Sequence, residues 1–185
     1  TQTTDFSVTA TPYQGDIVQQ FVDACRKYDM KVGLYYSTED FMILHQQGKV
    51  IRRRGVGYVK ISNNQELWEH SRKQLKELFT NYGPIDVVFL DCKQGPLARN
   101  YVHELQPNCI VTRDEMTTPE QTIPNEPVPG PWESCITLGD QWNFKPTNED
   151  YKSGGELIDM LVDIRAKGGN LLINMGPEPS GKMPF

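Results

Sequence analysis

Apolar residues follow two alternating patterns along the chain, one with the period of a helix and one made of short continuous runs. Helical spacing predicts helices over 16–28, 65–82, 97–105 and 154–167. Short apolar runs predict strands over 31–36, 85–90, 109–112, 134–138 and 170–175. The segment 37–62 and the proline-rich segment 117–131 carry neither pattern. Because most of the strands are separated by helices, we expect parallel βα units in an α/β protein.

Two architectures fit this alternation, a doubly wound open sheet and a (β/α)8 barrel. The open sheet usually carries a GxGxxG turn after its first strand, and neither that motif nor a GxxxxGK[ST] loop occurs. Barrels carry polar and catalytic residues just past the carboxyl ends of strands. Such residues are Tyr36-Ser37, Asp91, Arg113-Asp114, Asp140-Gln141-Trp142 and Asn174. They favour a (β/α)8 TIM-like barrel, incomplete at both ends, with about five of its eight strands present.

The domain organisation follows from length and from the two ends of the chain. A length of 185 residues favours one domain, so we expect residues 1–185 to form part of a single barrel domain. The chain opens without a preceding strand and ends within a loop, which indicates that N-terminal strands are missing. Because a partial barrel exposes strand edges, we expect it to associate with a missing barrel segment or with a second copy.

Charge and composition exclude several classes of protein. The net charge of −5 and pI near 5.2 argue against a nucleic acid partner, which needs a basic face. The basic cluster Arg52-Arg53-Arg54 is short and fits a solvated loop tip. No apolar run is long enough to cross a membrane, and no signal peptide is visible. Because the cysteines lack paired spacing, we expect buried thiols at Cys25, Cys92, Cys109 and Cys135.

Five stretches, in order along the chain, carry a resemblance to a known family. They are Thr9–Asp16, 21–37, the run ending at Asp91, Pro131–Cys135 and Lys167–Pro177. These stretches resemble motifs of glycoside hydrolase family 29, the α-L-fucosidases, over nearly the whole chain. The resemblance implies a catalytic barrel that hydrolyses terminal α-linked L-fucose with retention of configuration. In that family, two further N-terminal strands bear a Trp-Gly turn and a His-His pair, and a β-sandwich usually follows the barrel. Both are absent from this sequence.

The resemblance also implies the two carboxyl groups that retaining hydrolysis needs. Asp91 is expected to be the nucleophile, although its position alone fits a helix N-cap equally well. Glu133 is expected to be the acid/base, with a pKa raised by desolvation beside an aromatic ring. Its position alone also fits a surface glutamate, and its rivals in the same region are Glu115, Glu120 and Glu126. Directly after Asp91 the family usually has glycine, where this chain has Cys92. Two residues before Asp91 the family often has tryptophan, where this chain has Phe89.

Five further residues are expected to bind substrate. Arg113 resembles a family arginine that contacts the sugar or the nucleophile, and a salt bridge at the barrel rim is the alternative. Tyr35 and Tyr36 alternate across one strand, so one of them is expected to face the interior near the sugar. We favour Tyr36 because it is nearer the strand end. Trp132 and Trp142 are expected to stack on a sugar, although core packing is the commoner role of a lone tryptophan.

The remaining expectations concern cofactors, partners and competing functions. No cofactor is expected because the two-carboxylate mechanism uses water alone, and no cluster shows metal-ligand spacing. The implied substrate is a fucosylated oligosaccharide or glycoconjugate, and the expected location is secreted or periplasmic. Competing hypotheses are a non-catalytic fucose- or glycan-binding barrel and an inactive fragment of a fucosidase. A phosphate-binding barrel is the most distant, because Gly176-Pro177 with Gly181 only weakly resembles its glycine-rich loop.

Overall fold

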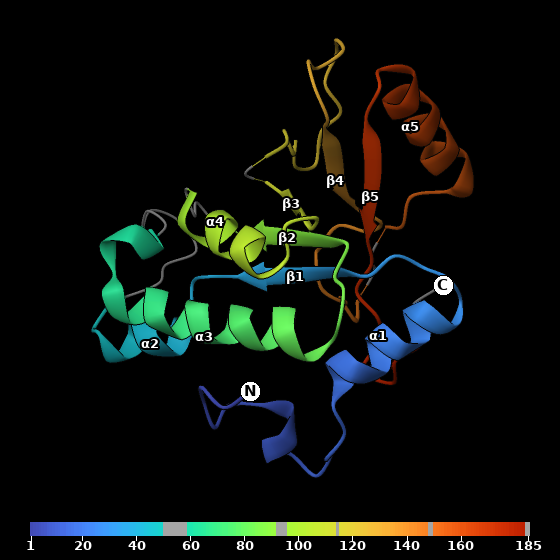
Figure 1. Ribbon diagram of the computed structural model, residues 1–185. Coiled ribbons are helices and arrows are strands. Elements are labelled where there is room, and N and C mark those ends of the chain that lie inside the picture. Colours follow the sequence, from blue (N-terminus) through green and yellow to red (C-terminus); the bar gives the residue numbers. More distant parts are fainter. Residues whose placement is uncertain (50–58, 92–95, 114, 148–149, 184–185) are drawn as a thin grey trace. The chain divides into compact units, whose positions relative to one another are not determined.

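The computed structural model describes residues 1–49, 59–91, 96–113, 115–147 and 150–183 (Figure 1). The chain divides into two compact units, Thr1–Glu115 and Met116–Phe185, and each unit has its own parallel sheet. Arg52-Arg53-Arg54, Cys92 and Asp114 lie outside the described residues. All five predicted strands are present and every pairing between them is parallel, which confirms the α/β prediction. Closure into a barrel stays a prediction.

The first unit contains a three-stranded sheet in the order β1-β2-β3 (Figure 1). Its strands are β1 (Gly33–Ser37), β2 (Val87–Asp91) and β3 (Ile110–Thr112). Ser37 pairs with Asp91, and Phe89 pairs with both Tyr35 and Thr112. Because the strands are parallel and in this register, their carboxyl ends lie together along one edge of the sheet.

Helices cover one face of this sheet. They are α1 (Ile17–Lys27), α2 (Phe41–Gln46), α3 (Gln65–Asn81) and α4 (Pro96–Leu105), with short 3-10 turns at Val8–Ala10 and Ile61–Asn63. Val22, Leu75 and Val102 of the helices share one hydrophobic core with Val88 and Leu90 of β2, and each is at most 1% exposed. Because strand side chains alternate, the other face of β2 carries Phe89 and Asp91.

Helix α2 lies within the segment 37–62, for which the sequence pattern predicted no element. It has six residues, too few for a helical period to show. Asp40 caps it, since the Asp40 carboxylate accepts a hydrogen bond from the Ile43 N–H at 2.9 Å. The buried side chains Ile43 and Leu44 then join the core of the first unit.

The second unit contains β4 (Glu133–Thr137), β5 (Asn170–Asn174) and α5 (Gly154–Ala166). Glu133 pairs with Asn170 and Thr137 pairs with Asn174, so the two strands end at the same level. Trp132, Ile136 and Ile164 form the core between β4 and α5, and each is at most 3% exposed. The segment 117–121 runs alongside β4, where Glu133 N–H donates to Thr117 O and Gln121 N–H donates to Cys135 O.

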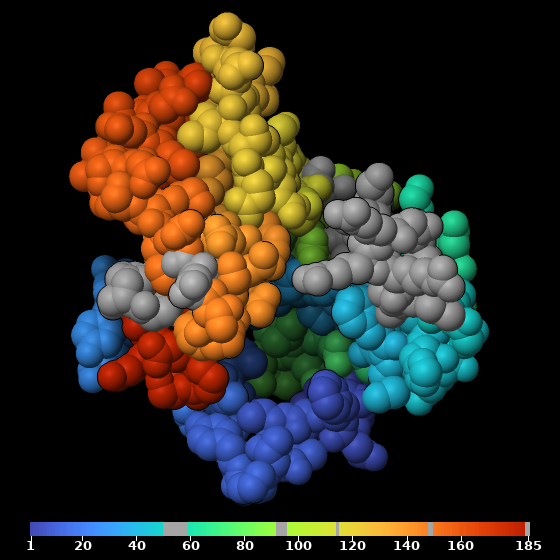
Figure 2. All heavy atoms as spheres, turned by 180° about the vertical axis from the view of Figure 1, so that it is seen from behind, coloured from blue at the N-terminus to red at the C-terminus, as the bar shows by residue number. Residues whose placement is uncertain are grey.

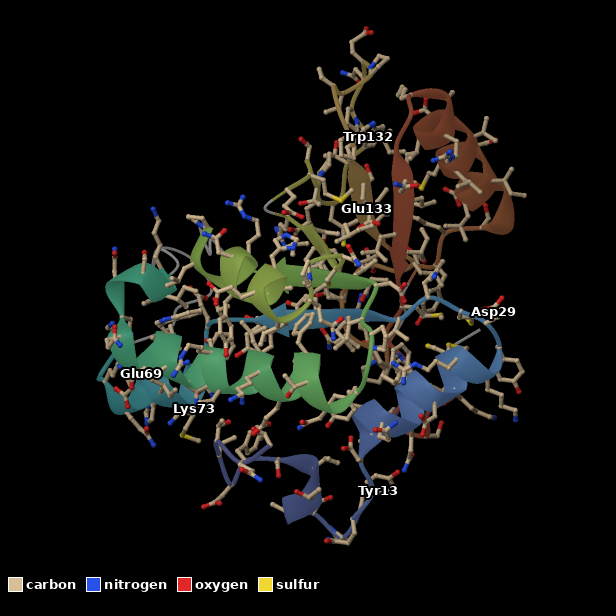
Figure 3. The ribbon with its side chains drawn as sticks, in the orientation of Figure 1. Tyr13, Asp29, Glu69, Lys73, Trp132 and Glu133 are labelled. Carbon is tan, nitrogen blue, oxygen red and sulfur yellow. The ribbon has the colours of Figure 1, made fainter. Side chains whose placement is uncertain are left out.

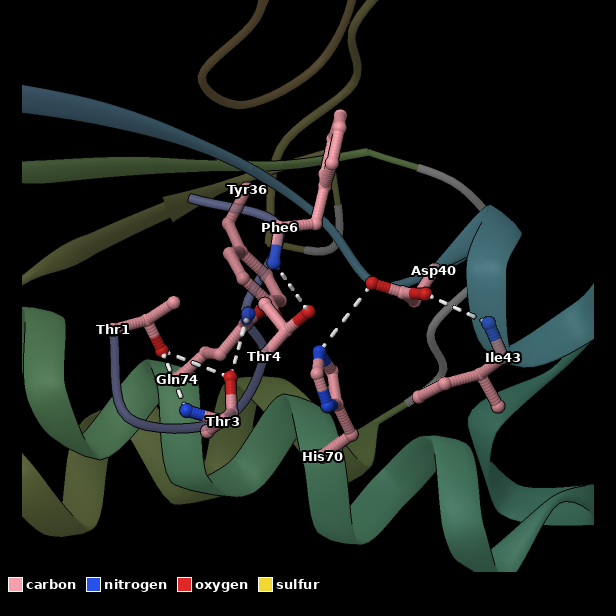
Figure 4. A network of polar contacts seen from close by, with 9 residues as sticks. All are labelled: Thr1, Thr3, Thr4, Phe6, Tyr36, Asp40, Ile43, His70 and Gln74. Carbon is pink, nitrogen blue, oxygen red and sulfur yellow. Dashed lines mark hydrogen bonds and ion pairs between the residues drawn. The ribbon is translucent and has the colours of Figure 1, made fainter. Parts of the chain in front are cut away.

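The N-terminal segment of the chain is attached to α3. Gln2 N–H donates to Glu77 Oε1 at 2.9 Å. Gln74 Nε2 donates to Thr3 Oγ1 at 3.0 Å, as Figure 4 shows. The segment is spread over the surface of the first unit, where Figure 2 shows it in dark blue. None of the helices in the described ranges is long and apolar enough to cross a membrane.

The predicted burial of the thiols is confirmed for Cys25, Cys109 and Cys135. Burial raises the pKa of the Cys109 thiol to about 11, so this thiol is protonated at neutral pH.

Candidate active site

The carboxyl end of β2 places the candidate nucleophile, Asp91, between two polar partners. The Tyr35 hydroxyl of β1 donates a hydrogen bond to Asp91 Oδ2. Arg113, which directly follows β3, donates from its guanidinium to Asp91 Oδ1 at 2.7 Å. The Asp91 and Arg113 side chains are 28% and 29% exposed, so the pair is sheltered and still reachable from solvent. Two fixed donors hold one carboxylate, as pre-organised catalytic groups require.

Phe89 completes this cluster and was missed as a site residue by the sequence analysis. Its ring stacks on Tyr35 with centroids 5.7 Å apart and planes 14° apart. The Arg113 guanidinium carbon lies 5.4 Å from the centre of the same ring. Phe89 therefore orients both groups that hold Asp91. Its spacing of two residues from Asp91 on a strand was the available signal, because such residues share a face.

The backbone of Arg113 also distinguishes this position. Its φ is 70°, in the left-handed region that residues other than glycine rarely adopt. Such a conformation costs about 1–3 kcal/mol and is found preferentially at functional sites. Here it follows the last residue of β3, and the resulting side chain reaches across to β2. The strained backbone of Arg113 thus accompanies a side chain that contacts Asp91.

The preference for Tyr36 as the tyrosine of the inner face is wrong. Tyr36 points toward the helices, where its hydroxyl donates to Gln74 Oε1 of α3 at 2.9 Å (Figure 4). Burial raises the pKa of the Tyr36 hydroxyl to about 12. Tyr35 occupies the opposite face and is 63% exposed. Alternation required that the two tyrosines face opposite sides, but being nearer the strand end did not determine which side is which.

Glu133, the candidate acid/base, lies in the second unit as the first residue of β4 (Figure 3). The strand begins one residue earlier than predicted. Glu133 is half-buried, and no described residue donates a hydrogen bond to its carboxylate. Burial raises its pKa above the ordinary value of a glutamate. A raised pKa favours the protonated form that a general acid needs. Against this role, barrel enzymes carry their catalytic groups at the carboxyl ends of strands, and Glu133 lies at the amino end of β4.

The three rival glutamates have different surroundings. Glu115 is engaged locally, because its Oε1 lies 2.7 Å from His103 Nε2 and its Oε2 accepts from Val111 N–H at 3.2 Å. Glu126 is exposed in the proline-rich loop. Glu120 is exposed and pairs with Cys135 at the edge of β4, two residues nearer the carboxyl end than Glu133. Glu120 is therefore the rival closest to the strand end where a barrel site forms.

The structure contradicts a substrate-binding role for Trp132. This side chain is 0% exposed and packs in the core of the second unit (Figure 3). Its indole Nε1 donates to Lys167 O at 3.2 Å, and a Cβ on Gly169 would lie 2.3 Å from its ring. Trp132 cannot stack on a sugar. Trp142, by contrast, is 42% exposed in the loop after β4.

The described ranges hold no group of three or more histidine, cysteine or carboxylate side chains arranged to bind a metal ion. Barrel enzymes place catalytic residues at the carboxyl ends of their strands, and a carboxylate in that position can act as a nucleophile.

Comparison with known proteins identifies the family. The model of the alpha-L-fucosidase family matches residues 1–185, and the chain belongs to that family. Plasma alpha-L-fucosidase of Rattus norvegicus is 27% identical over 91% of this chain and 41% of its own length. The chain thus spans about two fifths of the length of this relative.

Solved structures agree with this assignment. Alpha-L-fucosidase isoenzyme 1 from Paenibacillus thiaminolyticus is 28% identical with a TM-score of 0.79, covering 100% of this chain and 52% of its own. The AlfC enzyme of Lactobacillus casei, in complex with Fuca(1,6)GlcNAc, is 25% identical with a TM-score of 0.68. The match covers 95% of this chain and 62% of the AlfC chain.

Proposed function

We propose that this chain is part of the (β/α)8 catalytic barrel of an α-L-fucosidase, which releases terminal α-linked L-fucose from glycans with retention of configuration. The observation that carries the proposal is the Asp91 carboxylate held by Tyr35 and Arg113 at the carboxyl end of β2. Family membership over residues 1–185 supports the substrate class. So does the fucosylated disaccharide in the complex of the Lactobacillus casei relative.

The proposed reaction has two displacements. In the first, an Asp91 oxygen attacks the anomeric carbon of fucose, the bond from that carbon to the leaving oxygen breaks, and the acid/base protonates the leaving oxygen. In the second, the acid/base takes a proton from water, and the resulting hydroxide attacks the same carbon and releases fucose and the Asp91 carboxylate. Arg113 and Tyr35 keep that carboxylate oriented in both steps.

The acid/base is proposed to be Glu133, on the grounds of its half-buried carboxyl group and raised pKa. Retaining hydrolysis needs this group roughly 5 Å from the nucleophile. Since Glu133 opens β4, Glu120 is the alternative to test beside it. Neither assignment requires a metal or a cofactor, because water is the only second reactant.

The experiment measures release of the aryl alcohol from an aryl α-L-fucoside, by this chain and by a form extended to the length of its relatives. Replacing Asp91 by Gly should abolish release, and added azide should restore it with β-L-fucosyl azide as the product, because azide takes the place of the missing carboxylate. Glu133→Ala and Glu120→Ala are tested in the same way. The variant that lacks the acid/base should form α-L-fucosyl azide when azide is added. The outcome that contradicts the mechanism is full activity of the Asp91 variant.

Other outcomes of the same assay distinguish the competing hypotheses. Fucose binding without hydrolysis in both forms indicates a sugar-binding barrel. Hydrolysis by the extended form alone indicates that this chain is inactive by itself. Light scattering of the 185-residue chain tests its proposed association with a further barrel segment or a second copy.

We also propose a secreted or periplasmic location, for which the plasma location in the name of the rat relative is the support. Fucosidase activity found only in the cell extract of the source organism, and not outside its cytoplasm, would contradict it.

A further inference from the structure

The loop after β4 presents an exposed tryptophan. Trp142 lies five residues beyond the end of β4 and is 42% exposed, whereas Trp132 in the same unit is fully buried. Burial of its apolar surface stabilises the Trp132 indole, and the exposed Trp142 indole lacks much of that stabilisation. The loop also follows the carboxyl end of a parallel strand, where α/β enzymes build their sites. Its conformation is fixed by contacts from the neighbouring strand.

Asn174, the last residue of β5, makes two of these contacts. Its side-chain Nδ2 donates to the Trp142 carbonyl at 2.7 Å. Its backbone carbonyl accepts from Leu138 N–H at 2.8 Å, at the start of the same loop. Asn174 therefore binds the loop backbone at two points, at Leu138 where the loop begins and at Trp142.

Gly176 fixes the far side of the loop. A Cβ at this position would lie 2.2 Å from Phe144 N and 2.5 Å from Asn143 C, distances that real Cβ atoms essentially never show. Both neighbours are backbone atoms, so no flexible side chain can move away to make room. Only glycine lets the loop pass this close to the end of β5. The two residues directly after Trp142 therefore lie against Gly176, and the Trp142 carbonyl itself is bound by Asn174.

We propose that Asn174 and Gly176 are positioning residues that hold Trp142 as a stacking surface for a pyranose ring of the glycan. This inference rests on the proposed fucosidase function and names residues that serve its substrate binding. The hydrogen-bearing face of a pyranose is apolar and gains by covering an exposed indole face. A loop backbone held in place before binding also avoids the entropic cost of ordering the loop around the sugar. The pyranose is either fucose or the sugar to which it is attached.

The first test reads the tryptophan directly, in this chain and in the form extended to the length of its relatives. Acrylamide quenches exposed indoles, and comparison with Trp142→Phe assigns the quenchable fraction to Trp142. With Asp91→Asn also present, so that the disaccharide stays intact, L-fucose or Fuca(1,6)GlcNAc should protect that fraction. Protection by both sugars identifies fucose as the stacked ring, and protection by the disaccharide alone identifies the attached sugar.

The second test removes the positioning contacts while leaving the indole in place. Asn174→Asp keeps the side-chain shape but replaces the donor amide by an acceptor, and Gly176→Ala inserts the clashing Cβ. Each should raise KM for the disaccharide about threefold to tenfold, the range expected for loss of one aromatic stack. The kcat should stay within about twofold, because the contact is the same in the ground state and the transition state. Protection of Trp142 by sugar should weaken in parallel.

Asn143→Ala is the matched control, since its amide lies in the same loop and donates to Phe144 O at 3.2 Å without contacting β5. It should leave KM and protection unchanged, and thermal unfolding verifies that every variant is folded. Unchanged KM and protection in both positioning variants would overturn the inference. If Asp91-dependent hydrolysis persists in that case, the proposed function survives alone. Absence of both hydrolysis and sugar protection in the extended form overturns the two together.

Discussion

Tyr35 and Tyr36 provide the sharpest test of the site, because they are adjacent in sequence and face opposite sides of β1. Tyr35→Phe removes the hydroxyl that donates to Asp91 and keeps the ring that stacks on Phe89. A hydrogen bond to a charged group contributes about 1.5–3 kcal/mol. Tyr35 is 63% exposed, so water competes for the carboxylate and the lower end of that range applies. At about 1.4 kcal/mol per tenfold, kcat/KM should fall roughly tenfold.

Tyr36→Phe is the matched control. It removes the hydrogen bond from the Tyr36 hydroxyl to Gln74, which lies on the helix side of the sheet. That change should lower the free energy of unfolding by about 1 kcal/mol. It should leave kcat/KM for an aryl α-L-fucoside unchanged. Hydrolysis rates and thermal unfolding of both variants, measured in the extended form, separate the two effects. A loss of activity in Tyr36→Phe with none in Tyr35→Phe would refute the assignment of faces.

Three further outcomes are expected from the second unit. Trp132→Ala should lower the free energy of unfolding by about 3–5 kcal/mol, because a fully buried indole leaves a cavity, and calorimetry or urea unfolding measures this. Gly169→Ala should cost about 1–3 kcal/mol by overpacking the same ring, and an unchanged melting temperature would contradict that packing. Burial raises the pKa of Glu133 in the folded state, so its contribution to stability is fully present at acidic pH and is lost as pH rises through that pKa. Glu133→Gln should therefore be more stable than the parent at neutral pH, with the advantage shrinking in acid; an advantage that grows in acid would show the sign to be wrong.

The sequence by itself determined the order and type of most elements. The apolar run before Asp91 and the helical spacing over 65–82 are local patterns, and local patterns persist whatever the rest of the chain does. The same reasoning placed Asp91 at a strand end, since a polar residue that closes a buried run marks the carboxyl edge of a parallel sheet. Helix α2 was missed because a six-residue helix has no measurable period.

Only the tertiary structure decided which side chains belong to the cluster around Asp91 and which belong to a core. Period-two alternation separates Tyr35 from Tyr36 but does not label the faces, and the packing of α3 against one face does. The sequence assigned Trp132 and Trp142 the same role. The structure buries Trp132 in the core with Ile164, whereas the Trp142 backbone is bound by the end of β5 and its side chain is exposed. Tyr35 and Arg113 join Asp91 because three strands separated in sequence are parallel and in register. Such contacts depend on distant segments, which no local pattern encodes.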